Sequence, residues 1–215
     1  MVNATPAQFI VSRLAKHDEV LQAIDLDGRL VDVHRNEYPS FILAVVSTAR
    51  VEPAVIEEFT ADDRVDFVCN IPREAVWTGG AIELVQAKGK AWGGVGDLLS
   101  AAARRDPARE YVRREYEFIE RIFDQHSAVK RTERLYDRVY RLHRASKPLV
   151  DVVLVNEYDL TADHVRTAWE RYGPVTDILA NNPNCRFTSE AVCAAEQIGV
   201  KLLKVADFMR RLTSR

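Results

Sequence analysis

The chain of 215 residues has few of the residues that build disulfide frameworks or metal clusters. Its three cysteines, Cys69, Cys185 and Cys193, are widely spaced, and none belongs to a Cys-x-x-Cys pair. This excludes a disulfide framework and disfavours a zinc site, because both need cysteines at short, defined spacings. Scattered cysteines are typical of a reducing compartment, so we expect reduced thiols, a cytoplasmic location and no bound metal.

Long hydrophobic runs are also missing. The longest, such as Phe41 to Val46, have the length of a strand and are far shorter than the roughly 20 residues that cross a bilayer. The N-terminus has no charged segment followed by an apolar stretch, which a signal peptide requires. We therefore expect no membrane association.

A strong charge of either sign is absent as well. The formal net charge is −2, and 47% of the residues are hydrophobic, as in a globular protein with a substantial core. The whole molecule therefore has no general attraction for polyanions, and a nucleic-acid surface would have to be a local patch.

Strand and helix patterns alternate at both ends of the chain, which predicts mostly parallel β-sheets with flanking helices. The first helix is expected over residues 6 to 24, where apolar residues recur at roughly helical spacing. The expected strands are Leu30–His34, Phe41–Ser47, Val65–Asn70, Lys90–Trp92, Leu149–Asn156, Asp177–Ala180 and Val200–Val205. Further helices are expected over 52–59, 78–88, 97–103, 161–172, 188–198 and 206–212.

The middle of the chain differs in character. Residues 104 to 147 contain 11 Arg and 2 Lys against 8 acids and no glycine. Apolar residues fall on two helical stripes separated by a break, and Thr132 is a suitable cap for the second helix. The pattern predicts a basic helical connector over residues 105–147. Its candidate nucleic-acid contacts are Arg113, Arg114, Arg121, Arg134, Arg138 and Arg141.

Parts of the two ends match each other. The stretch from Thr78 to Asp97 aligns without a gap with the stretch from Thr188 to Asp207, and Gly89 coincides with Gly199. Asp66, Asn70 and Pro72 match Asp177, Asn181 and Pro183 after a shift of one residue. Most coincident residues have structural explanations, since threonine caps a helix start and glycine ends a helix.

This internal repeat defines the expected architecture. We expect an α/β protein with two related, mostly parallel sheet units joined by a helical segment. The expected parts are residues 1–104, the connector 105–147, and residues 148–215, which are related to residues 65–103. Farther upstream, Leu30–Val33 echoes Leu149–Val152 at a larger offset. Either the first half contains an extra strand or this echo is chance.

A family resemblance rests on the repeated stretches. Phe187-Thr188-Ser189-Glu190-Ala191, Gly199-Val200-Lys201-Leu202 and the segment from Asp207 resemble the last third of Mrr-type restriction-endonuclease domains. The tail of that family runs as a strand, an F-T-x-x-A helix, a G-I/V-x-L strand and a closing helix. Trp77-Thr78-Gly79-Gly80-Ala81 resembles the same tail. The resemblance implies a restriction-endonuclease-like fold in each half.

The chemistry of that family is incomplete here. The family needs an acid on one strand and Glu/Gln-x-Lys on the next, because carboxylates hold Mg²⁺ and the lysine positions water. Asp32 fits the first place, but Val45-Val46-Ser47-Thr48 lacks the second element, and no lysine follows Asp151 before Lys201. The resemblance therefore implies a degenerate, non-catalytic copy. The glycines from Gly93 to Gly96 fit a tight turn better than a phosphate loop.

Three functions remain open from the sequence. The preferred hypothesis is a non-catalytic restriction-endonuclease-like protein that binds nucleic acid or a partner protein. The alternative is an enzyme or ligand sensor with a pocket between the halves, and the third is a structural assembly subunit, which leaves homo-oligomerisation open. No complete nuclease, hydrolase or nucleotide-binding motif is present, so no cofactor is expected. The candidate polar pocket residues are Asp66, Asn70, Asp177 and Asn181.

Overall fold

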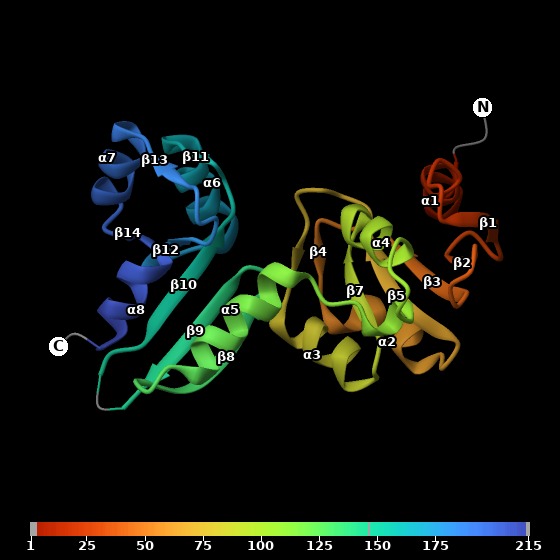
Figure 1. The fold of residues 1–215 in the computed structure, drawn as a ribbon, viewed down its shortest axis with the longest axis horizontal. Helices are drawn as coiled ribbons and strands as arrows, with labels where there is room; N and C mark the ends of the chain where they lie inside the picture. The colour runs from red at the N-terminus through yellow and green to blue at the C-terminus, as the bar shows by residue number, and fades with distance from the viewer. Residues whose placement is uncertain (1–3, 146, 214–215) are drawn as a thin grey trace. The chain divides into compact units, whose positions relative to one another are not determined.

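A computed structural model describes residues 4–145 and 147–213. The chain divides between Arg113 and Arg114 into two compact units (Figure 1). Each unit contains a five-stranded sheet flanked by helices, so the predicted α/β class with two related units is confirmed. Within the described ranges, every helix is too short or too polar to cross a membrane.

Unit 1 begins with a helix and three consecutive strands, after which strands and helices alternate. Its elements are α1 (Pro6–Leu14), β1 (Val20–Asp25), β2 (Leu30–Arg35), β3 (Phe41–Val46), β4 (Arg50–Val51), α2 (Pro53–Ala61), β5 (Val65–Asn70), β6 (Val76–Trp77), α3 (Gly79–Ala87), β7 (Ala91–Gly94), α4 (Val95–Ala102) and the 3₁₀ helix η1 (Ala108–Glu110).

The sheet of unit 1 has the order β1-β2-β3-β5-β7. The β1-β2 and β2-β3 pairs are antiparallel and the β3-β5 and β5-β7 pairs are parallel, so only β2 runs against the other strands. One apolar core lies between the sheet and helices α1 and α4, and a second lies under α2 and α3. The strands are rich in Val and Ile because both faces of the sheet are covered.

Unit 2 has the same order of elements. They are α5 (Arg114–Gln125), β8 (Val129–Tyr136), β9 (Val139–Arg144), β10 (Val150–Val155), β11 (Asp159–Leu160), α6 (Ala162–Tyr172), β12 (Asp177–Ala180), β13 (Arg186–Phe187), α7 (Ser189–Gln197), β14 (Lys201–Lys204) and α8 (Val205–Thr213). The sheet order is β14-β12-β10-β9-β8, and only β9 runs against the other strands. The strands β8, β9, β10, β12 and β14 are thus the counterparts of β1, β2, β3, β5 and β7.

The expected helix over residues 6 to 24 is wrong in its second part. Helix α1 ends at Leu14, and Val20–Asp25 forms β1, which pairs with β2. The apolar residues of this short segment fit a helix and a strand about equally, and pairing with β2 decides between them. Thr5 caps α1 by accepting a hydrogen bond from the N–H of Gln8 at 3.1 Å.

The expected connector contains only one of its two helices. Helix α5 is present, but residues 129–144 form the β8-β9 hairpin instead of a helix capped by Thr132. Tyr140 and Leu142 are buried whereas Arg141 and His143 are half-buried, which is the period of two that a strand requires. Because the units divide after Arg113, most of residues 105–147 belong to unit 2 and not to a separate connector.

The echo between Leu30–Val33 and Leu149–Val152 is chance, and neither sheet has a strand without a counterpart in the other. The first segment lies in β2 and the second enters β10, which is the counterpart of β3. A better match relates β2 to β9, where His34-Arg35 corresponds to His143-Arg144, 109 residues later. Both β1 and β8 also carry a bulge one position after their first residue, at the same offset.

The helix caps expected from the matched stretches are confirmed. Thr78 and Thr188 accept hydrogen bonds from the N–H groups of Ala81 and Ala191, at 3.4 and 3.1 Å. Gly89 and Gly199 follow α3 and α7 with φ angles of 63° and 74°, which favour glycine. No disulfide joins the cysteines: Cys69 and Cys185 are buried, Cys193 is exposed, and burial raises the pKa of the Cys69 thiol.

Candidate functional site

The two candidate pocket residues of unit 1 are held by internal hydrogen bonds. Asp66 accepts from the Ile42 N–H at 3.0 Å and from Arg109 Nε at 2.7 Å. The amide group of Asn70 accepts from the Thr48 N–H and donates to the Thr48 carbonyl, at 3.1 and 2.9 Å. Asn70 lies four residues after Asp66, about 13 Å farther along β5, so unit 1 does not bring the two side chains together.

The two candidate pocket residues of unit 2 differ in their bonding. Asp177 is fully buried and accepts hydrogen bonds from the Thr176 hydroxyl and the Arg211 guanidinium, at 2.6 and 3.0 Å. Asn181 follows β12, and its buried Oδ1 atom has no hydrogen-bond partner. Asp66 and Asp177 each pair with an arginine from the end of their unit, which is a structural role for both carboxylates.

The strands that would carry a nuclease metal site lack a pair of acids. Asp32 on β2 lies 3.1 Å from His34, and its neighbour on β3 is Ile42. Its counterpart on β9 is Arg141, whose Nε and Nη2 atoms each bond Asp151 on β10 at 2.8 Å. A guanidinium at this position neutralises the carboxylate that a cation would need. Among the residues placed by the structure, no group of three His, Cys, Asp or Glu side chains suits a metal.

Most of the predicted nucleic-acid contacts are already paired with acids. Arg113 bonds Asp97, Arg138 bonds Glu115 and Arg141 bonds Asp151. The Arg134 side chain is only 9% exposed, bonds Glu120 at 2.8 Å and stacks on the Tyr116 and Tyr140 rings. Of the six, only Arg114 and Arg121 are exposed, and Glu117 and Asp124 lie on the same exposed part of α5. These pairs cancel most of the positive charge that would attract phosphates.

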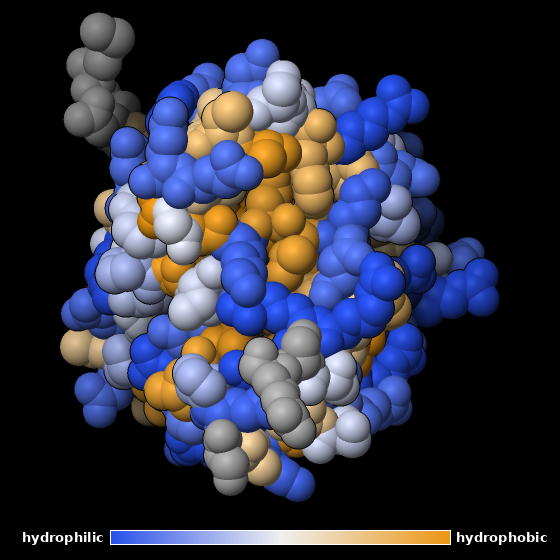
Figure 2. Space-filling view, turned by 90° about the vertical axis from the view of Figure 1, so that its left-hand side faces the viewer, coloured by the Kyte–Doolittle hydropathy of each residue, from blue (hydrophilic) through white to orange (hydrophobic). Residues whose placement is uncertain are grey.

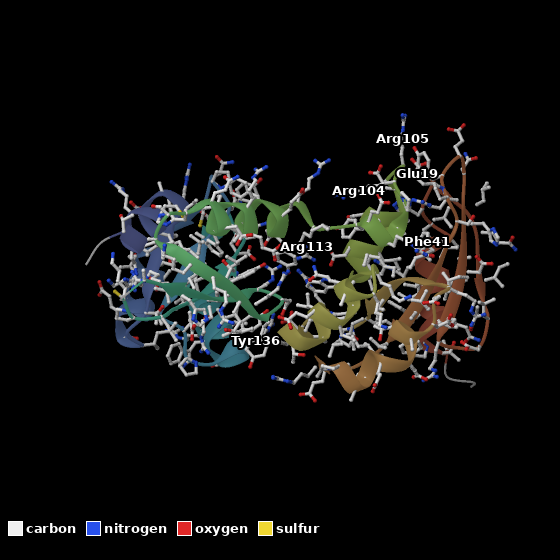
Figure 3. All side chains as sticks on the ribbon, turned by 90° about the horizontal axis from the view of Figure 1, so that it is seen from below. Glu19, Phe41, Arg104, Arg105, Arg113 and Tyr136 are labelled. Carbon is white, nitrogen blue, oxygen red and sulfur yellow. The ribbon has the colours of Figure 1, made fainter. Side chains whose placement is uncertain are left out.

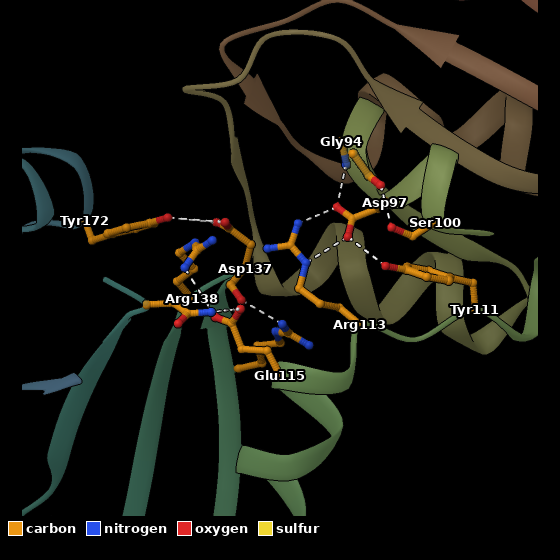
Figure 4. Close-up of polar contacts among 12 residues, drawn as sticks. Gly94, Asp97, Ser100, Tyr111, Arg113, Glu115, Asp137, Arg138 and Tyr172 are labelled. Atoms are coloured by element: carbon orange, nitrogen blue, oxygen red, sulfur yellow. Dashed lines mark hydrogen bonds and ion pairs between the residues drawn. The ribbon is translucent and has the colours of Figure 1, made fainter. Parts of the chain in front are cut away.

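The glycine loop before α4 is a tight turn around Asp97 and not a phosphate cradle. Asp97 accepts hydrogen bonds from the Gly94 N–H at 3.0 Å, the Tyr111 hydroxyl at 3.1 Å and two Arg113 nitrogens at 2.8 and 2.6 Å (Figure 4). A Cβ atom at Gly93 would lie 2.5 Å from the Asp97 side chain. The carboxylate occupies the space that an anion would need.

The basic residues after α4 also differ from one another. Arg104 stacks on the Tyr111 ring, 4.6 Å from its centroid, and donates to the Val112 carbonyl. Arg105 projects away from unit 1 (Figure 3). Burial is the main cause that raises the pKa of the Tyr111 hydroxyl, which keeps this group protonated as a donor to Asp97. Arg104 is thus held by contacts within unit 1, whereas Arg105 points away from the unit.

Polar side chains around the β8-β9 turn form a second internal network, in unit 2. Arg138 donates to Glu115 at 3.3 Å, and the Tyr172 hydroxyl donates to Asp137 at 3.2 Å (Figure 4). Burial raises the pKa of the Tyr172 hydroxyl, so the group remains a donor. This network holds the hairpin against α5 and α6, and its charged groups satisfy one another.

Strand β14 is one of the two outer strands of the unit 2 sheet. It pairs with β12 on one side, and no other described strand pairs with it. The Lys201 N–H donates to the Thr176 carbonyl across that pair at 3.1 Å. Because alternate residues of a strand face opposite neighbours, the N–H groups of Leu202 and Lys204 are directed away from β12. This edge therefore presents main-chain donors to a further strand.

Apolar side chains surround this edge. Leu202 and Leu203 are half-buried, Val192 on α7 is 39% exposed, and Lys201 and Lys204 are exposed. Figure 2 views the end of unit 2 that contains α7, β14 and α8, and shows hydrophobic side chains gathered there within a hydrophilic rim. We name this region the β14 edge surface, which consists of Val192, Ile198, Lys201, Leu202, Leu203, Lys204 and Val205.

The corresponding strand of unit 1 lacks these features. Its residues are Ala91, Trp92, Gly93 and Gly94, with no lysine, and the Trp92 ring packs on Trp77 with centroids 5.1 Å apart. The β14 edge surface is therefore specific to unit 2. Sequence reasoning missed it because Lys201-Leu202-Leu203-Lys204 reads as an ordinary strand; the signal available was a lysine at each end of an apolar pair.

Comparisons with protein-family models, with curated proteins and with solved structures give no match for this chain.

Proposed function

We propose that this chain is a non-catalytic binding protein of restriction-endonuclease-like architecture, formed by duplication of one α/β unit, and that it captures an extended segment of a partner protein along β14. The observation that carries this proposal is the β14 edge surface, where outward N–H groups, an apolar surface and flanking lysines coincide. Strand addition to a free sheet edge is a common mode of peptide recognition.

The duplication is supported by residues with equivalent contacts. Arg35 ends β2 and donates from Nε to the Pro39 carbonyl at 2.6 Å, whereas Arg144 ends β9 and donates from Nε to the Pro148 carbonyl at 3.2 Å. Each also bonds a carbonyl near the end of its unit's last long helix, Ala101 for Arg35 and Leu212 for Arg144. The two arginines and the two prolines are each 109 residues apart.

The restriction-endonuclease-like architecture is supported by the second part of each unit. After helix α2 in unit 1 and α6 in unit 2, both units continue with a long parallel strand, a threonine-capped helix, another parallel strand and a closing helix. This is the order that the resemblance implies. The absence of catalysis is supported by Arg141, because a cation between β9 and β10 would have to displace a guanidinium held by two hydrogen bonds.

The chemistry of the edge suggests what the partner segment carries. Lys201 and Lys204 flank Leu202 and Leu203, so a bound strand with apolar residues opposite the leucines and acids at its ends would match in both polarity and charge. Lysines at an exposed edge also oppose pairing of β14 with another β14, because like charges would meet. The surface therefore favours an acidic, extended partner.

Selection from a displayed library of random peptides tests this proposal. We expect enrichment of extended sequences with alternating apolar residues and flanking acids. The double substitution Lys201→Glu and Lys204→Glu changes only exposed side chains and should weaken binding of the selected peptides by about tenfold at low salt. The matched control is Lys130→Glu on the outer strand β8, which should leave binding unchanged. Failure to enrich such peptides, or equal binding by both variants, would contradict the proposal.

Nucleic acid remains the competing ligand of the same non-catalytic fold. The exposed Arg114 and Arg121 on α5 favour it, but the neighbouring acids oppose it. A gel-shift and cleavage assay with DNA and RNA, with and without Mn²⁺ and at two salt concentrations, separates the cases. Partner-protein binding predicts neither a salt-sensitive shift nor cleavage, whereas a shift lost in Arg114→Glu would favour nucleic acid.

A further inference from the structure

The outer strand of unit 1 is unusually apolar for an exposed sheet edge. Among the described residues β1 pairs only with β2, yet Leu21 and Ile24 are 69% and 38% exposed, and Leu26 directly after the strand is 48% exposed. The counterparts of Leu21 and Ile24 on β8, 109 residues later, are Lys130 and Glu133. Charges of both signs along β8 disfavour pairing at that edge, whereas β1 carries apolar residues at the same positions.

The chain around β1 is also uniformly acidic. Between Asp18 and Gly28 it carries four acids, Asp18, Glu19, Asp25 and Asp27, and no base. Asp18 and Asp27 are exposed, and Glu19 and Asp25 are partly exposed. An apolar strand with acids at both ends is the chemistry that the β14 edge surface favours in its partner.

We infer that β1 of one copy of the chain adds to β14 of a second copy. This inference rests on the proposed function, because it names the partner of the β14 edge surface. The Leu26 N–H donates to the Leu30 carbonyl within the β1-β2 pair, so the main-chain groups of Ala23 and Asp25 are directed outward. In an antiparallel register that places Asp25 opposite Leu202, the outward groups of the two strands meet, Ile24 faces Leu203 and Ala23 faces Lys204. This register forms one apolar cross-strand pair, Ile24 with Leu203, and places Asp25 diagonal to Lys204 on the same face, within reach of the long lysine side chain; both contacts stabilise a sheet.

The other edge combinations are less favourable. Two β1 strands would bring their acidic ends together, and two β14 strands would bring their lysines together. Pairing of β1 with β8 would place Ile24 against charged side chains such as Lys130, Arg131 and Glu133. The β1-β14 contact uses different surfaces on the two copies, so it is heterologous and builds rings or filaments.

Cysteine cross-linking tests the register and the partner together. In a Cys193→Ser background, Ala23→Cys protein is mixed with Lys204→Cys protein and oxidised mildly. We expect a disulfide-linked dimer on a non-reducing gel from the mixture and none from either protein alone. Lys130→Cys replaces Lys204→Cys as the control. Cross-linking no stronger than in this control overturns the inference. In a chain that carries both cysteines, a cross-link that forms only within one chain also overturns it.

Light scattering separates this inference from the proposed function. The substitutions Leu21→Lys and Ile24→Glu copy the counterpart residues of β8 at exposed positions, so the fold should be preserved. We expect the wild type to show a molar mass that rises with concentration and falls at high salt, and the variant to remain monomeric. A wild type that is monomeric throughout overturns the inference, whereas peptide binding at β14 would then still support the proposed function. If the wild type neither self-associates nor binds peptides at β14, both the inference and the proposed function are wrong.

Discussion

Replacing Asp97 by alanine is expected to destabilise unit 1 by about 3 kcal/mol, because the substitution breaks a nearly buried ion pair and leaves donors without an acceptor. The Asp97 side chain is 8% exposed and accepts from Gly94, Tyr111 and Arg113. It also ties the glycine turn before α4 to the segment after η1. Denaturant unfolding followed by the fluorescence of Trp77 and Trp92, which both belong to unit 1, measures the effect.

The matched control is Asp207→Ala in unit 2. Asp207 is the counterpart of Asp97, but it is 48% exposed and pairs with the exposed Arg210 in the next turn of α8. Exposed pairs of this kind contribute about 0.5 kcal/mol or less. The substitution should barely change the unfolding of unit 2, followed by Trp169. If Asp97→Ala and Asp207→Ala lower the free energy of unfolding equally, burial does not determine how much these aspartates stabilise their units.

Replacing Arg35 by methionine is expected to destabilise unit 1 by a similar amount, about 3 kcal/mol. Arg35 is 4% exposed and donates to the carbonyls of Pro39, Ala101, Arg104 and Asp106. These include the last carbonyls of α4, which have no partner within the helix. Burial lowers the pKa of Arg35 from its usual value, although the guanidinium remains charged.

Arg144→Met is the paired control for Arg35→Met. Arg144 bonds the carbonyls of Pro148 and Leu212 and is partly exposed, so its loss leaves fewer carbonyls without a donor. We expect Arg144→Met to lower the free energy of unfolding of unit 2 by about 1.5 kcal/mol, measured by the same denaturant titration. A larger loss for Arg144→Met than for Arg35→Met would contradict the assigned roles of the two arginines.

The sequence was sufficient to predict elements with strong local signals. Thr78 and Gly89 delimit α3, and Thr188 and Gly199 delimit α7, because capping and left-handed glycine are local effects. It was insufficient for Val20–Asp25 and for residues 129–144, where short apolar spacings fit both periods and pairing with a distant strand decides. The missed β8-β9 hairpin also concealed the correspondence between His34-Arg35 and His143-Arg144.

The candidate site was harder to predict than the fold. The sequence shows three matched polar residues, Asp66, Asn70 and Asp177. In the structure, their side chains form hydrogen bonds with the backbone and with arginines of their own unit. The basic character of residues 104–147 is real, but the acids that cancel it lie on neighbouring elements, such as Asp151 on β10. Conversely, the lysines at the two ends of Lys201–Lys204 do not by themselves identify an outer strand, because strand order depends on the whole sheet.

The most direct test of the central claim is hydrogen exchange of the chain with and without a selected peptide, resolved to single residues. Strand addition predicts slower exchange of the outward N–H groups of Leu202 and Lys204 on binding. The Lys201 N–H, which already bonds the Thr176 carbonyl, should change little. Protection confined to α5 and the β8-β9 hairpin, with β14 unchanged, would contradict the account and move the binding surface to the arginine-rich segment.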